Sequence, residues 1–110
     1  MIDGKWEFSF VSPLGKHVMD MDVKVEGSEF TGTLNGKINS NVAIMDGKID
    51  GDTIRFSALL QTPKGVSDTT TVLTLCKDTE DEKAIVEAMS GTISTKFGRF
   101  DANAKKYVTV

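Results

Sequence analysis

The chain has 110 residues, with 13 Lys and Arg against 16 Asp and Glu, which gives a formal net charge of −3. A chain of this length buries more than half of its unfolded surface in one core, so we predict a single domain over residues 1–110 that needs no disulfide or metal. The positive charges form no basic block. Nucleic acid is therefore not expected as a partner, because phosphate binding needs a clustered positive face.

The cysteine count and the apolar runs indicate where the chain resides. Cys76 is the only cysteine, which excludes an internal disulfide, and residues 1–4 contain no charged-then-apolar signal region. The longest apolar runs, such as residues 57–60, are far shorter than the roughly 20 residues that cross a bilayer. We therefore expect a soluble, cytoplasmic protein that does not interact with membranes.

Apolar and polar residues alternate along much of the chain. Trp6, Phe8 and Phe10 alternate with Glu7 and Ser9, and residues 19–25 repeat the pattern with methionine and valine on one face. A period of two is typical of a strand that buries one face and exposes the other to water. The sequence therefore predicts an all-β protein.

Turn residues separate these alternating runs. Ser12-Pro13-Leu14-Gly15 and Thr62-Pro63-Lys64-Gly65 suit reverse turns, because proline presets φ and glycine tolerates positive φ. Glycine also marks hairpins at residues 26–28 and 50–52. The predicted strands are 4–12, 16–26, 29–36, 41–49, 53–62, 66–77, 88–95 and 97–106.

Two short motifs recur in the second half of the chain. Ser12-Pro13-x-Gly15 returns 50 positions later at residues 62–65, and Phe30-Thr31-Gly32-Thr33-Leu34 returns 59 positions later as Met89-Ser90-Gly91-Thr92-Ile93. Each half then supplies four strands, and the nine-residue difference falls in the acidic stretch 78–83. The alternative is that common turn residues match by chance.

Local signals conflict in residues 78–89. Thr79-x-x-Glu82 is a capping-box pattern, residues 83–89 are rich in helix formers, and Gly91 suits a helix C-cap, whereas the repeat requires a strand by Met89. We predict a loop with at most one helical turn at 80–87 and a strand from Ala88. We also predict that residues 78–87 have the least amide protection in the chain, below that of the 19–25 strand.

Eight antiparallel strands joined by short connections predict an up-and-down β-barrel, since closure removes exposed sheet edges. Gly4-Lys5-Trp6, followed by Phe30-Thr31-Gly32-Thr33, resembles the avidin and streptavidin branch of the calycin superfamily. The resemblance implies that Trp6 closes one end of the barrel beneath a basic residue near the last strand. Lys105 and Lys106 are the candidates, with Arg99 less well placed.

The resemblance does not extend to biotin. Avidins hold biotin with polar side chains at places that here look like Phe8 and Leu34, and they cover its ring with further tryptophans, whereas Trp6 is the only one in this chain. We therefore expect no useful affinity for biotin.

Residues that carry chemistry are few. His17 and Cys76 are the only histidine and thiol and lie on different predicted strands. No metal-ligand spacing or phosphate-binding glycine motif is present, and Asp20 and Asp22 share a face that is expected to be solvated. We predict no enzyme activity, catalytic residue, metal site or cofactor. His17 is expected at the rim with its hydrogen bonds satisfied; haem ligation and acid–base chemistry are the alternatives.

The function predicted from these residues is non-enzymatic binding of a small, mainly apolar molecule inside the barrel. The alternatives are a filled barrel that serves as a structural or homo-oligomerisation module through outward residues such as Val11 and Leu59, and an isomerase-like enzyme with an apolar pocket. An interior void of several hundred cubic ångströms would favour binding. The predicted ligand-binding residues are Phe8, Phe10, His17, Met19, Met21, Leu34, Phe56 and Ala58.

Overall fold

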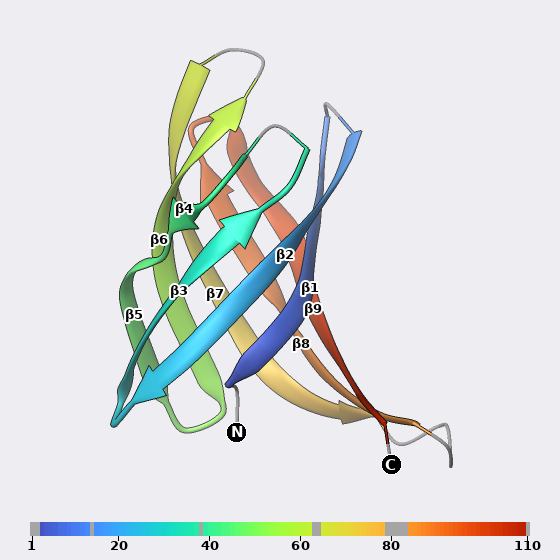
Figure 1. The fold of residues 1–110 in the computed structure, drawn as a ribbon. Helices are drawn as coiled ribbons and strands as arrows, with labels where there is room; N and C mark the ends of the chain where they lie inside the picture. Colours follow the sequence, from blue (N-terminus) through green and yellow to red (C-terminus); the bar gives the residue numbers. More distant parts are fainter. Residues whose placement is uncertain (1–2, 14, 38, 63–64, 79–83, 110) are drawn as a thin grey trace.

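A computed structural model gives the fold of the chain and describes residues 3–13, 15–37, 39–62, 65–78 and 84–109. Figure 1 shows an all-β molecule in which the strands wrap into a barrel. The strands are β1 (Gly4–Ser12), β2 (Gly15–Glu26), β3 (Glu29–Asn35), β4 (Val42–Ala43), β5 (Met45–Asp50), β6 (Thr53–Thr62), β7 (Gly65–Asp78), β8 (Ala84–Thr95) and β9 (Gly98–Thr109).

The barrel is closed, antiparallel and of the up-and-down type. Consecutive strands pair with each other except β4 and β5, and β9 pairs with β1 to complete the circle. The short strands β4 and β5 both pair with β3 and together occupy one position, so the barrel has eight positions. The predicted fold class is confirmed. None of the described residues belongs to a helix long and apolar enough to cross a bilayer.

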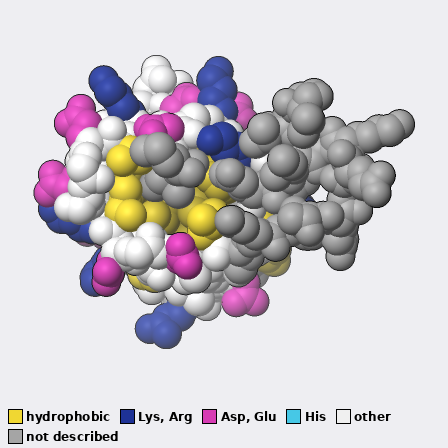
Figure 2. Space-filling model, turned by 90° about the horizontal axis from the view of Figure 1, so that it is seen from below, with side chains coloured by type: hydrophobic (Ala, Val, Ile, Leu, Met, Phe, Trp, Pro, Cys, Tyr) yellow, Lys and Arg dark blue, Asp and Glu magenta, His cyan; other side chains and the backbone are white. Residues whose placement is uncertain are grey.

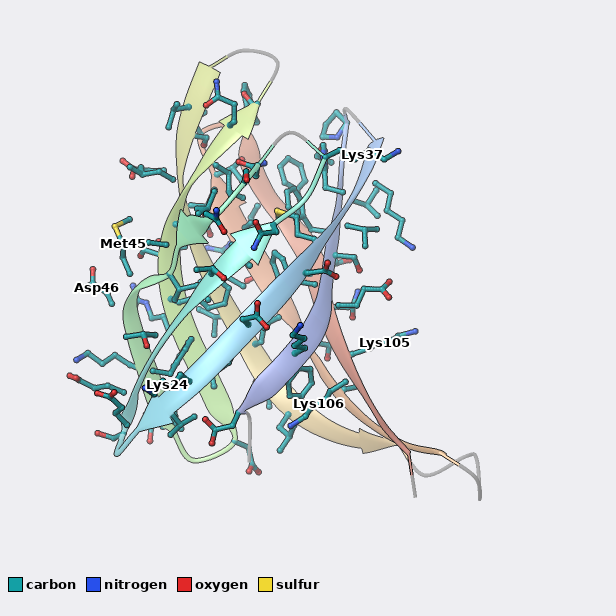
Figure 3. The ribbon with its side chains drawn as sticks, in the orientation of Figure 1. Lys24, Lys37, Met45, Asp46, Lys105 and Lys106 are labelled. Carbon is teal, nitrogen blue, oxygen red and sulfur yellow. The ribbon has the colours of Figure 1, made fainter. Side chains whose placement is uncertain are left out.

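The predicted strand 41–49 is interrupted. Ile44 separates β4 from β5, and the pairing of β5 with β6 shifts register between Met45 and Lys48. Asp46, at φ 52°, adopts the left-handed conformation there. Such a bulge sets two residues against one on the partner strand, so Met45 and Asp46 are both exposed and point away from the barrel (Figure 3), while Ile44 is buried. Alternation alone could not reveal this interruption.

The prediction for residues 80–87 was wrong over its second half. Strand β8 begins at Ala84 rather than at Ala88, so residues 84–87 form no helical turn. Residues 79–83 lie outside the described residues. The reason is tertiary: Val86 pairs with Asp78 of β7, and Ala84 pairs with Thr109 of β9. A short helix is marginal by itself, so strand pairing on both sides overrides its local signals. The predicted low amide protection of 78–87 stays a prediction.

The two halves of the chain correspond in register. Val23 pairs with Gly32 in the first half, and Leu73 pairs with Gly91 in the second, at the same offsets of 50 and 59 that the motifs show. In the first half, the last pair before the hairpin turn is Glu26 opposite Glu29. The equivalent pair in the second half is Cys76 opposite Ala88. Two residues lie between the first pair and eleven between the second, which accounts for the nine-residue difference.

Aromatic side chains fill the barrel toward the end at which β1 begins. The ring of Phe56 makes edge contacts with Phe8 and Phe30, at centroid distances of 6.1 and 6.0 Å. Figure 2, which views the molecule from this end, shows apolar side chains at the centre with charged side chains around them. We call this the closed end. The largest fully buried hydrophobic side chains are Trp6, Phe8, Met21, Leu34, Ile54, Phe56, Leu73, Met89 and Ile93.

Trp6 lies at the closed end as predicted and is 2% exposed. Lys106 of β9 places its Nζ 5.8 Å from the centre of the indole ring, so one of the two predicted lysines makes the expected contact. The same Nζ donates a hydrogen bond to the backbone carbonyl of Asp3, whose carboxylate accepts one from Val25 N at 2.7 Å. These contacts tie the start of β1 to both of its neighbouring strands.

Candidate functional site

The other end of the barrel contains a cavity of about 370 Å³. It lies where β1–β2, β6–β7 and β8–β9 connect, away from Trp6, and we call this the open end (Figure 1). The volume falls in the range of small-molecule pockets. The residues that line it include Phe10, Ser12, His17, Met19, Asn39, Leu60, Ser67, Thr69, Phe97 and Phe100.

One wall of the cavity is built from β1 and β2 and is mainly apolar. Phe10 and His17 pair across these strands, and their rings stack at a centroid distance of 4.8 Å. His17 Nε2 shares a hydrogen bond of 3.1 Å with Ser12 Oγ, so the ring is held at the rim in a fixed orientation. Met19 continues this wall inward and is buried. The flat stacked pair and the thioether form a surface suited to an apolar or aromatic molecule.

The opposite wall is polar. Ser67 and Thr69 of β7 occupy positions 50 residues after His17 and Met19, and four strand positions separate β7 from β2 in either direction around the barrel. Both hydroxyl side chains are buried. Thr69 Oγ1 donates to the carbonyl of Ala58 at 2.8 Å, and Ser67 Oγ accepts from Lys96 N at 3.2 Å.

Both hydroxyl protons are already donated, since Ser67 Oγ also donates to the carbonyl of Asp68 at 3.2 Å, and each oxygen keeps a lone pair that can accept a hydrogen bond from a polar ligand atom. The cavity therefore combines an apolar wall on β1 and β2 with hydrogen-bonding groups on β7.

Thr71 continues the hydroxyl row below the cavity. Its side chain is fully buried, and its Oγ1 finds no hydrogen-bond partner among the described residues. An unsatisfied buried hydroxyl costs about 1–3 kcal/mol, and valine has nearly the same shape. We expect Thr71→Val to raise the free energy of unfolding by about 1 kcal/mol in urea denaturation. Thr69→Val, which removes a satisfied hydroxyl, is the control and is expected to be destabilising. A loss of stability in Thr71→Val would show that this hydroxyl has a partner in the folded protein.

The loop between β3 and β4 forms part of the rim. Gln61 N donates to Asn39 Oδ1 at 2.7 Å, and Asn39 Nδ2 donates back to the carbonyl of Gln61 at 3.4 Å. Within the loop, Gly36 N donates to the carbonyl of Asn39 at 2.7 Å. Asn39 is buried. The side chain of Asn39 therefore attaches the loop to β6 at the mouth of the cavity, because it bonds to both the backbone N–H and the carbonyl of Gln61.

The structure divides the eight predicted ligand-binding residues into two groups. Three of them, Phe10, His17 and Met19, line the cavity. The others also face inward but lie in the packed part of the barrel, outside the cavity lining; they are Phe8, Met21, Leu34, Phe56 and Ala58. The alternation identified the inward face, but it could not indicate how far along the barrel the packing extends.

Sequence reasoning missed the polar wall and the rim. Ser67 and Thr69 share the parity of Leu73 on the same strand, and this signal could have placed them inside. Serine and threonine are mostly exposed residues, so an alternating run that contains them is normally assigned to solvent. Asn39 had no such signal, since its position depends on a contact across the loop.

The other candidate reactive residues of the sequence do not lie together in one site. The register places His17 opposite Phe10 near the open end, whereas Cys76 pairs with Ala88 toward the other end, so the two residues do not form a Cys–His pair. Asp20 is exposed and Asp22 is half-buried on the outside of β2. Within the part of the chain that the structure describes, no three His, Cys, Asp or Glu residues form a potential metal site.

Comparison of the chain with protein-family models, with curated proteins and with solved structures gives no significant match.

Proposed function

We propose that this protein is a non-enzymatic binder of a small, mainly apolar molecule, held in the cavity at the open end. The observation that carries the proposal is the void of about 370 Å³, which the barrel leaves unfilled above an otherwise tightly packed interior. Its apolar wall provides area to bury, and the hydroxyls of Ser67 and Thr69 provide the few polar groups that orient a ligand.

The alternative of a filled structural module has less support. Val11 and Leu59 are exposed, at 58% and 47%, and lie on β1 and β6. Four strand positions separate these strands in either direction, so the two side chains are on opposite sides of the barrel and do not form one continuous apolar patch. A filled interior would also leave no cavity at the open end.

The resemblance to the calycin superfamily is part of this proposal. It is supported by the closed barrel and by the contact between Trp6 and Lys106. In small barrels of eight strands, side chains fill the interior or leave room for one small ligand. This barrel has a part of each kind. The interior packing lies toward the closed end, and the cavity lies at the open end.

A cavity-filling variant tests the proposal. Leu60 is buried and lines the cavity, whereas the preceding residue, Leu59, points outward. We expect the neutral probe 2-naphthamide to bind the wild-type protein and to shift the NMR resonances of Phe10, Met19 and Thr69. Leu60→Trp is expected to weaken binding at least about tenfold, a loss of 1.4 kcal/mol, while the control Leu59→Trp leaves it unchanged.

If Leu60→Trp is poorly folded, the NMR shifts that 2-naphthamide causes in the wild-type protein still test the proposal. Shifts confined to outer-face residues, or equal affinity in a folded Leu60→Trp variant, would contradict the proposal. If the expected shifts are observed, native mass spectrometry of protein purified from its own cells identifies the physiological ligand.

A further inference from the structure

The charges around the cavity differ from those of the whole chain. The chain is acidic, at −3, yet the charged residues that line the cavity are Lys16 and Lys37, and no described aspartate or glutamate lines it. Lys16 lies at the start of β2, next to His17, and Lys37 lies in the loop that Asn39 fastens across the mouth. Both side chains are exposed at the open end, where Figure 3 shows Lys37.

A second depression, beside the cavity, is also lined by charged residues that are mainly positive. It lies on the outside between β1 and β9 and is lined by Lys16, Arg99 and Lys105, with Asp101 as its one acidic residue among those described. Phe10, Phe100 and Lys16 line both this depression and the cavity.

The sheet itself explains why the two depressions adjoin. The pairing between β1 and β9 extends only from Glu7 opposite Lys105 to Phe10 opposite Ala102. The parts of both strands nearer the open end are not paired with each other. Positive side chains therefore flank the aromatic side chains of Phe10 and Phe100 both at the mouth and at the adjoining side wall.

We infer that the ligand carries an anionic group, such as a carboxylate, next to its apolar body. This inference rests on the proposed function and specifies the class of ligand. The apolar body lies against Phe10 and Met19, and the anion lies at the mouth within reach of Lys16 and Lys37. A negative charge held at the mouth keeps part of its hydration, whereas one placed among the buried side chains would lose it at high cost.

Two probes of the same shape test the inference. 2-Naphthoate and 2-naphthamide share a ring system, and only the first is charged. We expect titration calorimetry at low salt to show that wild-type protein prefers the naphthoate by roughly tenfold, the scale of two exposed ion pairs. The preference is expected to decrease as salt is added, because the lysines are exposed to screening.

Lysine variants locate the effect. The double variant Lys16→Gln/Lys37→Gln is expected to bind the two probes with equal affinity. Lys24→Gln is the matched control, since Lys24 is exposed on the same strand as Lys16 but lies toward the closed end (Figure 3). This control is expected to keep the full preference for the naphthoate.

The possible results separate the inference from the proposed function. Equal binding of the two probes by wild-type protein, or a preference that survives in the double variant, would overturn the inference and leave the cavity-binding proposal standing. Absence of binding by both probes would overturn the cavity-binding proposal and the inference together.

Discussion

Replacing Gly91 with alanine is expected to prevent normal closure of the barrel. A Cβ atom at this position would lie 1.9 Å from the carbonyl oxygen of Val72 on the neighbouring strand. The equivalent position of the first half, Gly32, is equally tight, with 1.8 Å to the carbonyl oxygen of Asp22. Backbone cannot move aside as a flexible side chain can, so each substitution should cost at least about 3 kcal/mol, a large part of the stability of a small domain.

Urea denaturation followed by circular dichroism measures this loss. Gly51→Asn is the control, because no atom lies within 4 Å of a Cβ built at Gly51 and asparagine tolerates its φ of 59°. The control is expected to stay within about 1 kcal/mol of wild type. A mild effect for either Gly32→Ala or Gly91→Ala would mean that the two strand pairs are not equivalent, and the correspondence between the halves would fail with it.

Replacing Trp6 with alanine is expected to cost about 3–5 kcal/mol, the usual range for removing a core aromatic side chain. Trp6 is 2% exposed, and the substitution would leave a void at the closed end beside Lys106. Thermal and urea unfolding measure the change. Phe97→Ala is the control, since Phe97 is 40% exposed and should lose less than about 1 kcal/mol. A loss near 0.5 kcal/mol for Trp6→Ala would contradict the inward orientation of β1.

Periodicity and turn residues were sufficient to predict most of the fold. Alternation identified the inward face of β1 and β2 because one side of each strand is buried and the other is solvated. The resemblance to calycins predicted a basic residue over Trp6, and Lys106 occupies that place. The interruption at Ile44 and the start of β8 at Ala84 were not predicted. A bulge and an extended hairpin depend on pairing with distant strands, which local sequence does not encode.

The candidate site was predictable only in part. Phe10, His17 and Met19 were identified because they are apolar or aromatic on an inward face. Ser67 and Thr69 were not, since buried hydroxyls look like solvent-facing ones in a sequence. The position of the cavity along the barrel depends on where side-chain volume is insufficient to fill the interior, and this is a property of the assembled barrel.

The correspondence between the halves has a consequence for the orientation of a bound ligand. An unbroken two-fold axis would give β2 and β7 identical inner surfaces, and a ligand could then bind in two equivalent orientations. Here the repeat relates Met19 to Thr69, so the matching walls carry a thioether on one side and a hydroxyl on the other. Under the proposed function, a ligand with one hydrogen-bonding edge therefore has a single preferred orientation, with that edge toward β7.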